Sequence, residues 1–212
     1  MRLPLVTPRL ELRRFQADDL EALFGVFGDP EVMRYVGTLR LPLSEAEVRE
    51  ALERAAKHWR EHGFGPLAVV ERATGAVVGD TGLQLLEGGP DVELTCTLAR
   101  GVWGRGYATE AATAALDWGF GDPRPERIFA VADPENVASR RVLEKAGLRR
   151  VGTRRCYGAD HDEFVADRPD PNADPRTATG LTAANGPATG LSATDEPAHG
   201  SDGAADEPAG ER

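Results

Sequence analysis

The chain has 212 residues, 41% of them hydrophobic, and a formal net charge of −10 at pH 7. This length and apolar content suffice for one domain with a substantial core. The acidic balance argues against nucleic acid and anionic membranes as partners, because affinity for phosphates comes mainly from Lys and Arg. The acidic balance does not exclude ribosomal proteins as partners, because these proteins are basic.

The N-terminus lacks the continuous apolar core of a signal peptide, and no run of about 18 apolar residues occurs. We therefore expect a cytoplasmic protein. Cys96 and Cys156 lie far apart and form no CxxC motif, so we expect two buried or half-buried free thiols. His58 and His62 lack a third ligand nearby and are interpreted as surface residues, so no metal site is expected.

The composition changes after residue 168. Residues 169–212 contain no Phe, Tyr or Trp and are rich in Ala, Gly, Pro, Thr, Asp and Glu. Such a segment cannot bury enough apolar surface to offset the entropy lost on ordering. Its eight acidic residues and two arginines give a net charge of −6, which leaves −4 for the rest of the chain. The sequence predicts a domain over residues 1–168 and a disordered acidic tail over 169–212.

The domain begins with a strand pattern followed by a helix pattern. Residues 8–15 alternate apolar and charged side chains, as a strand with one wet face does. Residues 16–27 have apolar side chains at helical spacing. The pair Asp29-Pro30 is expected to end that helix.

A second helix and three strands follow. Ser44 and Glu47 form a capping box, which predicts a helix that continues to about His62. Residues 66–86 predict an antiparallel hairpin. Residues 91–99 alternate again, with an apolar face and a polar face, and predict a further strand.

The last part of the domain alternates helices and strands. Its pattern predicts a helix over about 107–120, a strand over 127–132 and a helix that opens at Asn136. Strands over 149–155 and 162–167 close the domain. An antiparallel middle followed by βα crossovers predicts a three-layer α/β domain around one sheet.

A glycine turn, Trp103–Thr109, lies between a predicted strand and a predicted helix. Gly104 and Gly106 allow a phosphate to approach the backbone closely, and the helix N-terminus adds N–H donors. The turn alone fits either an ordinary loop or a pyrophosphate site. It lacks the Lys-Ser/Thr of a Walker loop and the third glycine of a Rossmann fingerprint.

Two separated motifs carry a specific resemblance. The chain contains "ELTCTLARGVWGRGYATEA" and, further on, "NVASRRVLEKAGLRRVG". In this order they resemble the GNAT superfamily of N-acetyltransferases, and most closely its RimJ/RimL branch, which acetylates N-terminal amines of ribosomal proteins. The resemblance spans residues 7–167. It implies a GNAT-type sheet, mixed and mostly antiparallel, in which the strands near 92–98 and 127–132 splay apart to admit the pantetheine arm of acetyl-CoA.

The resemblance also implies where acetyl-CoA, the co-substrate, is held. Family members bind its pyrophosphate with main-chain N–H groups of the glycine turn and its thioester carbonyl with an N–H of the preceding strand. The implied cofactor-binding residues are Thr97, Leu98, Val102, Trp103, Gly104, Arg105, Gly106, Tyr107, Ala108, Thr109 and Asn136. Gly101 departs from the Gln or Arg of many members, which leaves open whether Arg100 or Arg105 supplies that phosphate contact.

Two residues are implied in catalysis. Glu93 matches the Glu of the family's E-I-G-Y strand and is the candidate base, although a Glu on the wet face of a strand is ordinarily only solvated. Ser139 matches the residue beside the thioester sulfur in relatives. Its hydroxyl is a poor acid against a thiol of pKa about 8.5, so we expect it to donate a hydrogen bond to the developing thiolate. On local grounds, Asn136 is an N-cap and Ser139 an ordinary helix residue.

The expected reaction is direct attack of a primary amine on the thioester, without a metal or a protein nucleophile. The acceptor is expected to be a protein N-terminal α-amine or a small-molecule amine, and its pocket to form from residues 30–43 and 154–163. A non-catalytic domain that binds or senses acyl-CoA is the alternative. The sequence is compatible with either a monomer or a homodimer.

Overall fold

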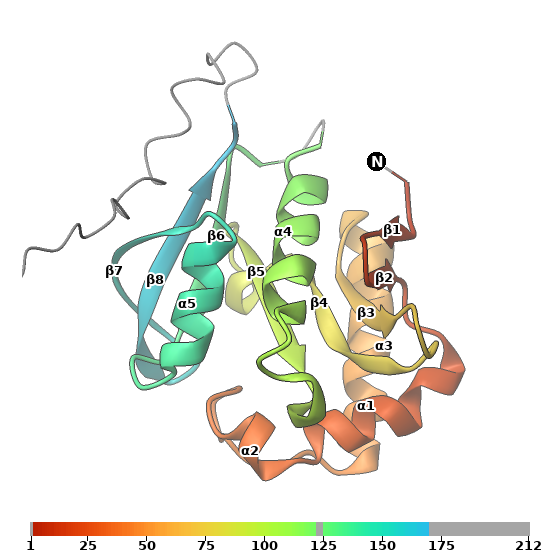
Figure 1. Ribbon diagram of the computed structural model, residues 1–212. Helices are drawn as coiled ribbons and strands as arrows, with labels where there is room; N and C mark the ends of the chain where they lie inside the picture. Colours follow the sequence, from red (N-terminus) through yellow and green to blue (C-terminus); the bar gives the residue numbers. More distant parts are fainter. Residues whose placement is uncertain (1, 122–124, 170–212) are drawn as a thin grey trace, which may run out of the picture. The chain divides into compact units, whose positions relative to one another are not determined.

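The computed structural model describes residues 2–121 and 125–169 (Figure 1). The expected tail lies outside the described residues apart from Pro169, so the boundary at residue 168 stays a prediction. The strands are β1 (Leu5–Val6), β2 (Leu10–Arg13), β3 (Pro66–Glu71), β4 (Val77–Leu85), β5 (Val92–Leu98), β6 (Arg127–Ala132), β7 (Arg149–Cys156) and β8 (Ala159–Asp167). The helices are α1 (Leu20–Phe27), α2 (Pro30–Met33), α3 (Glu45–His62), α4 (Tyr107–Gly119) and α5 (Val137–Lys145).

One eight-stranded sheet organises the domain, in the order β1-β2-β3-β4-β5-β6-β8-β7. Neighbouring strands are antiparallel except β5 and β6, which run parallel. β5 pairs with β4 along the whole length of β5, whereas β5 and β6 pair only at Glu93 and Phe129. The predicted sheet, mixed and mostly antiparallel with one splayed pair of strands, is confirmed.

Helices cover both faces of this sheet. In Figure 1, α4 and α5 lie in front of the sheet and α3 lies behind it. Ala111, Ala112 and Ala115 are fully buried, so α4 sits close to the strands as its small residues predict. A Cβ added to Gly119 would lie only 2.6 Å from the Leu83 side chain. The three-layer α/β architecture follows from this close packing.

The ends of α3 follow their sequence signals. The Ser44 main-chain N–H donates to the Glu47 carboxylate at 2.7 Å, and the Glu47 N–H donates to the Ser44 hydroxyl at 3.3 Å. Gly63 ends the helix with φ of 72°, a left-handed conformation that favours glycine. Near this end, Trp59 packs on Trp118 with ring centroids 5.6 Å apart, and both are buried.

The first third of the chain contains two elements that were not predicted. The first helix, α1, ends at Phe27, just before Asp29-Pro30 as predicted, and Asp29 then caps the short helix α2. The Asp29 side chain accepts a hydrogen bond from the Glu31 N–H at 2.9 Å, and Pro30 occupies the first helical position, where its missing N–H costs nothing. A short strand, β1, also precedes the predicted first strand and pairs with it.

The interpretation of His58 as a surface residue is wrong. His58 is half-buried, its Nδ1 lies 3.0 Å from the Phe64 carbonyl oxygen, and its Nε2 accepts the Leu85 N–H at 3.1 Å. It therefore ties the end of α3 to β4. The thiols of Cys96 and Cys156 are free, the first half-buried and the second buried, as predicted.

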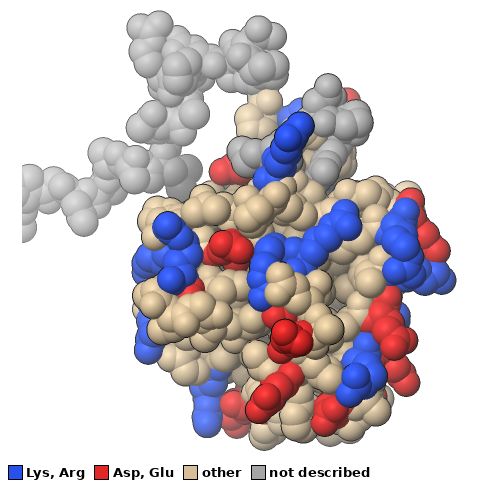
Figure 2. All heavy atoms as spheres, turned by 90° about the vertical axis from the view of Figure 1, so that its right-hand side faces the viewer, with Lys and Arg blue, Asp and Glu red and all other residues tan. Residues whose placement is uncertain are grey.

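The surface charges are mixed. Figure 2 shows Lys and Arg interspersed with Asp and Glu over the face on the right-hand side of Figure 1. Such a surface presents no extended basic stripe on that face, in agreement with the acidic balance of the sequence. Within the described part of the chain, no helix is long and apolar enough to cross a membrane.

Candidate active site

The parallel strands β5 and β6 open away from their single pairing point. From Glu93 to Leu98, β5 advances about 17 Å at about 3.3 Å per residue, and β6 does not pair with it over that length. Thr95, Cys96 and Thr97 are half-buried, although they belong to a central strand. This divergence is the splayed pair of strands that was expected, and we call the region between β5 and β6 the cleft.

Main-chain donors of β5 line the opening. The Ala99 N–H donates to the Val78 carbonyl across the β4 pair at 2.8 Å. In an antiparallel ladder such bonded positions recur at every second residue. The N–H groups of Cys96 and Leu98 therefore point the other way, to the side where β6 has diverged. They are oriented to bind a carbonyl oxygen placed in the cleft.

The glycine turn follows directly at the wide end of the cleft. Gly104 and Gly106 have φ of 74° and 78°, the left-handed region in which glycine is favoured. Trp103 is half exposed, and its Nε1 donates to the Leu98 carbonyl at 2.8 Å, which ties the turn to β5. The turn between Trp103 and Gly106 is exposed and leads into the N-terminus of α4.

This turn fits a pyrophosphate. The first N–H groups of an α-helix have no partner within the helix, so those at the start of α4 are available to an anion. Ala108 and Thr109 lie half-buried in that first turn. Of the two arginines named for the missing phosphate contact, Arg100 pairs with Asp29 at 3.4 Å and Arg105 with Glu71 at 3.6 Å. Both guanidinium groups stay more than half exposed at the rim of the turn.

Glu93 lies at the closed end of the cleft. It is only 3% exposed, so the expectation of a wet strand face is wrong at this position. Tyr157 on the β7–β8 turn donates its hydroxyl to Glu93 Oε2 at 2.5 Å, and Gln84 donates its side-chain amide to the same oxygen at 3.1 Å. Within the described residues, both of these hydrogen bonds are accepted by Oε2 and neither uses Oε1. Glu93 is therefore a fixed carboxylate with one oxygen left for a ligand.

The environment of Glu93 changes its acidity. Burial raises the pKa of Glu93, and the hydrogen bonds from Tyr157 and Gln84 offset that rise only in part. The pKa of the Tyr157 hydroxyl is raised as well, by burial and by the charge of Glu93, so Tyr157 stays a protonated donor. A carboxylate with a raised pKa is a better base than an ordinary surface Glu.

Asn136 and Ser139 lie at the start of α5, just after β6. The Asn136 side-chain oxygen accepts the Ser139 N–H at 3.0 Å, so the local interpretation of Asn136 as an N-cap holds. The Ser139 side chain is half-buried. Both residues follow β6, the strand that diverges from β5.

Tyr107 does not point into the cleft. It is 8% exposed, and its hydroxyl donates to Glu71 Oε1 on β3 at 2.7 Å. This bond is the first cause of the lowered pKa of Glu71. The Tyr107 side chain thus anchors the start of α4 and leaves only its main chain to the glycine turn.

Two further polar groups on the sheet were not found from the sequence. Asp80 on β4 stands opposite Thr97, and its Oδ1 is buried without a hydrogen-bond partner among the described residues. Burial raises the pKa of Asp80 to about 7. Thr95 Oγ1 is likewise buried and unpaired within the described ranges. An Asp inside an otherwise apolar strand was the signal available in "VVGDTGL".

The segments expected to form the acceptor pocket lie next to each other. A Cβ at Gly158, on the β7–β8 turn, would be 3.0 Å from Thr38 Cγ2. Arg40 pairs with Asp133, directly after β6, at 2.6 Å, and Asp133 is buried. Residues 34–43 therefore reach both the hairpin turn that carries Tyr157 and the wall formed by β6.

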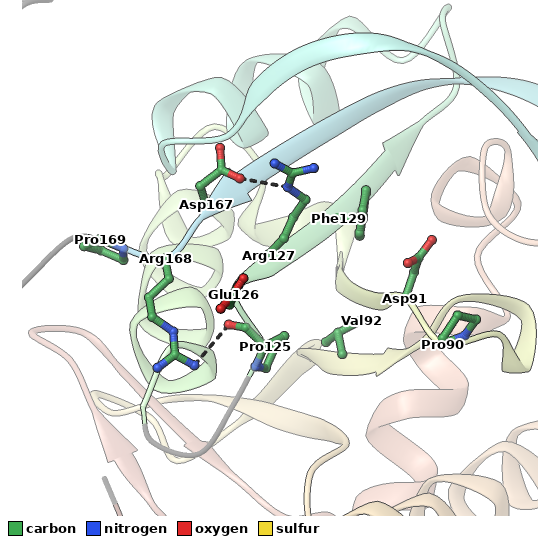
Figure 3. A pocket seen from close by; sticks show the side chains of 10 residues that line it. All are labelled: Pro90, Asp91, Val92, Pro125, Glu126, Arg127, Phe129, Asp167, Arg168 and Pro169. Atoms are coloured by element: carbon green, nitrogen blue, oxygen red, sulfur yellow. Dashed lines mark hydrogen bonds and ion pairs between the residues drawn. The ribbon is translucent and has the colours of Figure 1, made fainter.

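A separate cavity of about 850 Å³ lies at the other ends of β5 and β6 (Figure 3). Its lining includes Asp91, Arg127 and Asp167, and the last two form an ion pair at 2.8 Å. The diverging halves of β5 and β6 lie at the opposite ends of these strands. The cavity has neither the glycine turn nor Glu93, so we do not assign the chemistry to it.

Known proteins share this architecture. A family model described as an acetyltransferase (GNAT) domain matches residues 9–149. The uncharacterized protein YkkB of Bacillus subtilis (strain 168) is 36% identical over 156 residues, which are 72% of this chain and 89% of that protein. A GNAT-family acetyltransferase of Bacillus anthracis has a structure with a TM-score of 0.66 and 26% identity, over 77% of this chain and 98% of its own.

A more distant structure shares the fold alone. RimL, a ribosomal L7/L12 alpha-N-protein acetyltransferase solved in complex with coenzyme A, has a TM-score of 0.66 at 15% identity, over 78% of this chain and 98% of its own. The family match covers both the glycine turn and β5. The chain belongs to the GNAT family and is an N-acetyltransferase.

Proposed function

We propose that the chain acetylates a primary amine, in the first place the α-amine of a protein N-terminus and otherwise a small-molecule amine. Glu93 carries this proposal, since it is a buried carboxylate with a raised pKa and one free oxygen at the closed end of the cleft. An α-amine has a pKa near 8, against about 10.4 for a lysine side chain, so its proton is easier for a carboxylate to take. The site therefore favours α-amines.

Each end of the cleft has a separate task. The glycine turn, with the main chain from Val102 to Thr109, holds the pyrophosphate of acetyl-CoA, which supplies an activated acetyl group. The N–H groups of Cys96 and Leu98 donate to the thioester oxygen and stabilise the negative charge that develops there. Glu93 Oε1 accepts the proton that the attacking ammonium must lose, directly or through one water.

The wall formed by β6 and α5 completes the reaction. When the new C–N bond forms and the C–S bond breaks, the electron pair remains on the thiolate sulfur. Ser139 donates a hydrogen bond to that thiolate, which then takes up a proton from solvent and leaves as the free thiol of coenzyme A. Asn136 holds the pantetheine arm beside it. Neither Cys96 nor Cys156 acts as a nucleophile, because burial raises the pKa of these thiols to about 12 and about 11.

The RimJ/RimL branch is supported by the motifs around the glycine turn, which lie within the matched GNAT domain. Most ribosomal proteins are basic, and the chain carries a net charge of −10. Opposite net charges favour encounter between the two proteins. We therefore propose a ribosomal or other protein N-terminus as the first acceptor to test.

Thiol release from acetyl-CoA tests the proposed function. We expect release with a peptide that has a free α-amine, and none with the same peptide blocked at its N-terminus. Mass spectrometry should place the acetyl group on the α-nitrogen. If the chain binds acetyl-CoA but releases no thiol with any peptide or small amine, the proposal is wrong and a sensor of acyl-CoA is the better account.

A further inference from the structure

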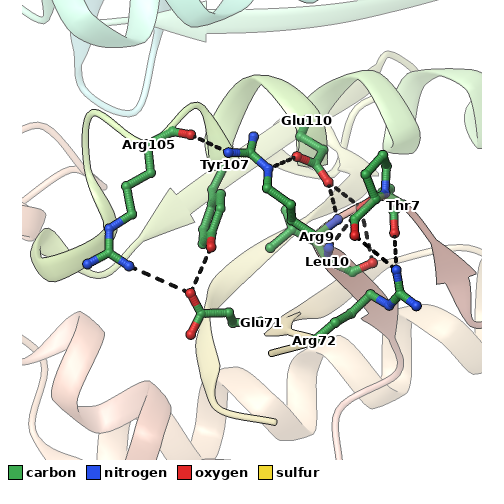
Figure 4. Close-up of polar contacts among 9 residues, drawn as sticks. Thr7, Arg9, Leu10, Glu71, Arg72, Arg105, Tyr107 and Glu110 are labelled. Atoms are coloured by element: carbon green, nitrogen blue, oxygen red, sulfur yellow. Dashed lines mark hydrogen bonds and ion pairs between the residues drawn. The ribbon is translucent and has the colours of Figure 1, made fainter. Parts of the chain in front are cut away.

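The N-terminal segment contacts the glycine turn directly (Figure 4). The Thr7 hydroxyl donates to Glu110 Oε1 at 2.6 Å, and the Arg9 main-chain N–H donates to the same oxygen at 2.9 Å. Arg9 Nε donates to Glu110 Oε2 at 2.6 Å. Glu110 lies in the first turn of α4. One carboxylate on the helix thus fixes both Thr7 and Arg9.

The guanidinium group of Arg9 also reaches the backbone of the turn. Arg9 Nη1 donates to the Arg105 carbonyl at 2.7 Å, and the guanidinium lies 4.7 Å from the centroid of the Tyr107 ring. A Cβ at Gly106 would lie 3.4 Å from Arg9 Nη2. Arg9 therefore lies against the peptide that joins Arg105 to Gly106.

This contact determines the direction of a main-chain donor. In a trans peptide the C=O of one residue and the N–H of the next point in opposite directions. Arg9 holds the Arg105 carbonyl on its own side, so the Gly106 N–H points away from Arg9. With φ of 78°, Gly106 has a left-handed conformation that glycine adopts readily. The bond from Arg9 is the side-chain contact that holds the Arg105 carbonyl.

The carboxylate that holds Arg9 is kept ionised. Burial alone would raise the pKa of Glu110, but the hydrogen bonds from Thr7 and Arg9 prevail and lower it. The Arg9–Glu110 pair therefore persists at neutral pH. Beside it, Tyr107 and Arg105 both contact Glu71, so the start of α4 is tied to β3 as well.

We propose that Arg9, held by Glu110, is a positioning residue for the pyrophosphate of acetyl-CoA, because it orients the Gly106 N–H towards the phosphate oxygens. Arg9 acts through the peptide that it holds and takes no part in acetyl transfer. Its loss should therefore weaken the binding of donors that carry the pyrophosphate and leave the chemical step unchanged.

Donors with and without phosphates test the proposal in the full-length chain. We expect Arg9→Ala to raise the Kd for coenzyme A about tenfold, as measured by calorimetry. This change corresponds to the loss of one hydrogen bond to a charged group. The KM for acetyl-CoA should rise by a similar factor with kcat unchanged. S-acetylpantetheine lacks the pyrophosphate, so its kcat/KM should be the same in the variant and the wild type.

Arg72→Ala is the matched control. Arg72 Nη1 donates to the carbonyls of Thr7 and Pro8 at 2.9 Å, so it supports the same segment without contact to the glycine turn. If Arg72→Ala weakens coenzyme A binding as much as Arg9→Ala, the segment acts by general support and the proposal is overturned. Equal losses with acetyl-CoA and S-acetylpantetheine overturn it too.

A second variant covers the case in which Arg9→Ala does not fold. Glu110→Gln keeps an oxygen acceptor but removes the charge that holds Arg9, so we expect a smaller loss of affinity in the same direction. An unchanged Kd for coenzyme A in Glu110→Gln contradicts the role of the pair. Since calorimetry needs no acceptor amine, these results do not depend on whether the proposed amine substrate is correct.

Discussion

The two ends of the cleft use the same residue type in opposite ways. Glu110, at the glycine turn, accepts hydrogen bonds from Thr7 and Arg9 with both oxygens, and its pKa is lowered. Glu93, at the closed end, is buried, accepts both of its bonds on one oxygen, and has a raised pKa. One glutamate is an anchor and the other is suited to be a base.

The difference comes from the neighbours that each carboxylate has. Burial alone would raise the pKa of Glu110, but the hydrogen bonds that Thr7 and Arg9 donate to it, together with the Arg9 charge, outweigh that effect. Glu93 has only neutral donors within hydrogen-bond distance, Tyr157 and Gln84, so the cost of burial prevails. The balance between burial and hydrogen bonds, more than the residue type, sets the direction in which the pKa of each carboxylate is shifted.

The largest expected effect is that of Glu93→Gln. The substitution keeps the volume but removes the base, so we expect kcat to fall by about 10²–10⁴ with the KM for acetyl-CoA nearly unchanged. Steady-state thiol release measures both constants. Glu110→Gln is the matched substitution at the other end and should leave kcat nearly unchanged. A wild-type kcat in the Glu93→Gln variant would show that Glu93 is not the base.

Gly106→Ala should affect the other end of the cleft. An alanine with φ near 78° is strained by about 1–2 kcal/mol. We therefore expect roughly tenfold weaker coenzyme A binding in calorimetry. Gly101→Ala is the control, since a Cβ there meets no atom within 4 Å. Equal affinities of these two variants contradict the assignment of the phosphate site to this turn.

Tyr157→Phe should produce a few-fold change that depends on pH. The Tyr157 hydrogen bond lowers the pKa of Glu93, so its removal should raise that pKa further. Because the base must be deprotonated, the acid limb of the kcat/KM profile should move to higher pH. Turnover at alkaline pH should stay close to that of the wild type. If Tyr157 serves as a proton donor instead, the loss will appear at alkaline pH and the acid limb will not move.

The smallest effect is expected from Asp80→Asn, on stability. The pKa of Asp80 is raised from 3.8 to about 7, so the folded state binds more protons than the unfolded state between these pH values. Wild-type stability should therefore lose this contribution as pH rises from 4 to 7. The variant should have a Tm a few degrees higher than the wild type at pH 8 and an equal Tm at pH 4. If thermal unfolding gives the two proteins equal Tm values at pH 8, the ionised Asp80 does not destabilise the folded state.

The elements with strong local signals were predictable from the sequence. The capping box at Ser44 and Glu47 fixed the start of α3, and Gly63 fixed its end. The glycine turn and the helix after it were also found in their observed places, because glycines between a strand and a helix are local features.

The partners of the candidate site residues were not predictable. Glu93 and Tyr157 are 64 positions apart, and the sequence alone gave no reason to pair them. The contact of Arg9 with the turn spans 96 positions and depends on the order of strands in the sheet. Asp29-Pro30 follows the end of α1 as predicted, but α2 was not expected, because the same pair can follow one helix and begin another. Long-range packing determines such contacts, and local patterns do not report it.

A structure of the full chain with coenzyme A bound tests the central claim most directly. We expect the pyrophosphate oxygens within hydrogen-bond distance of the Gly106 N–H, and the pantetheine arm between β5 and β6 with its thiol at the end nearer to Glu93. Coenzyme A bound elsewhere, for example in the cavity lined by Asp91 and Arg127, would contradict the account of the cleft.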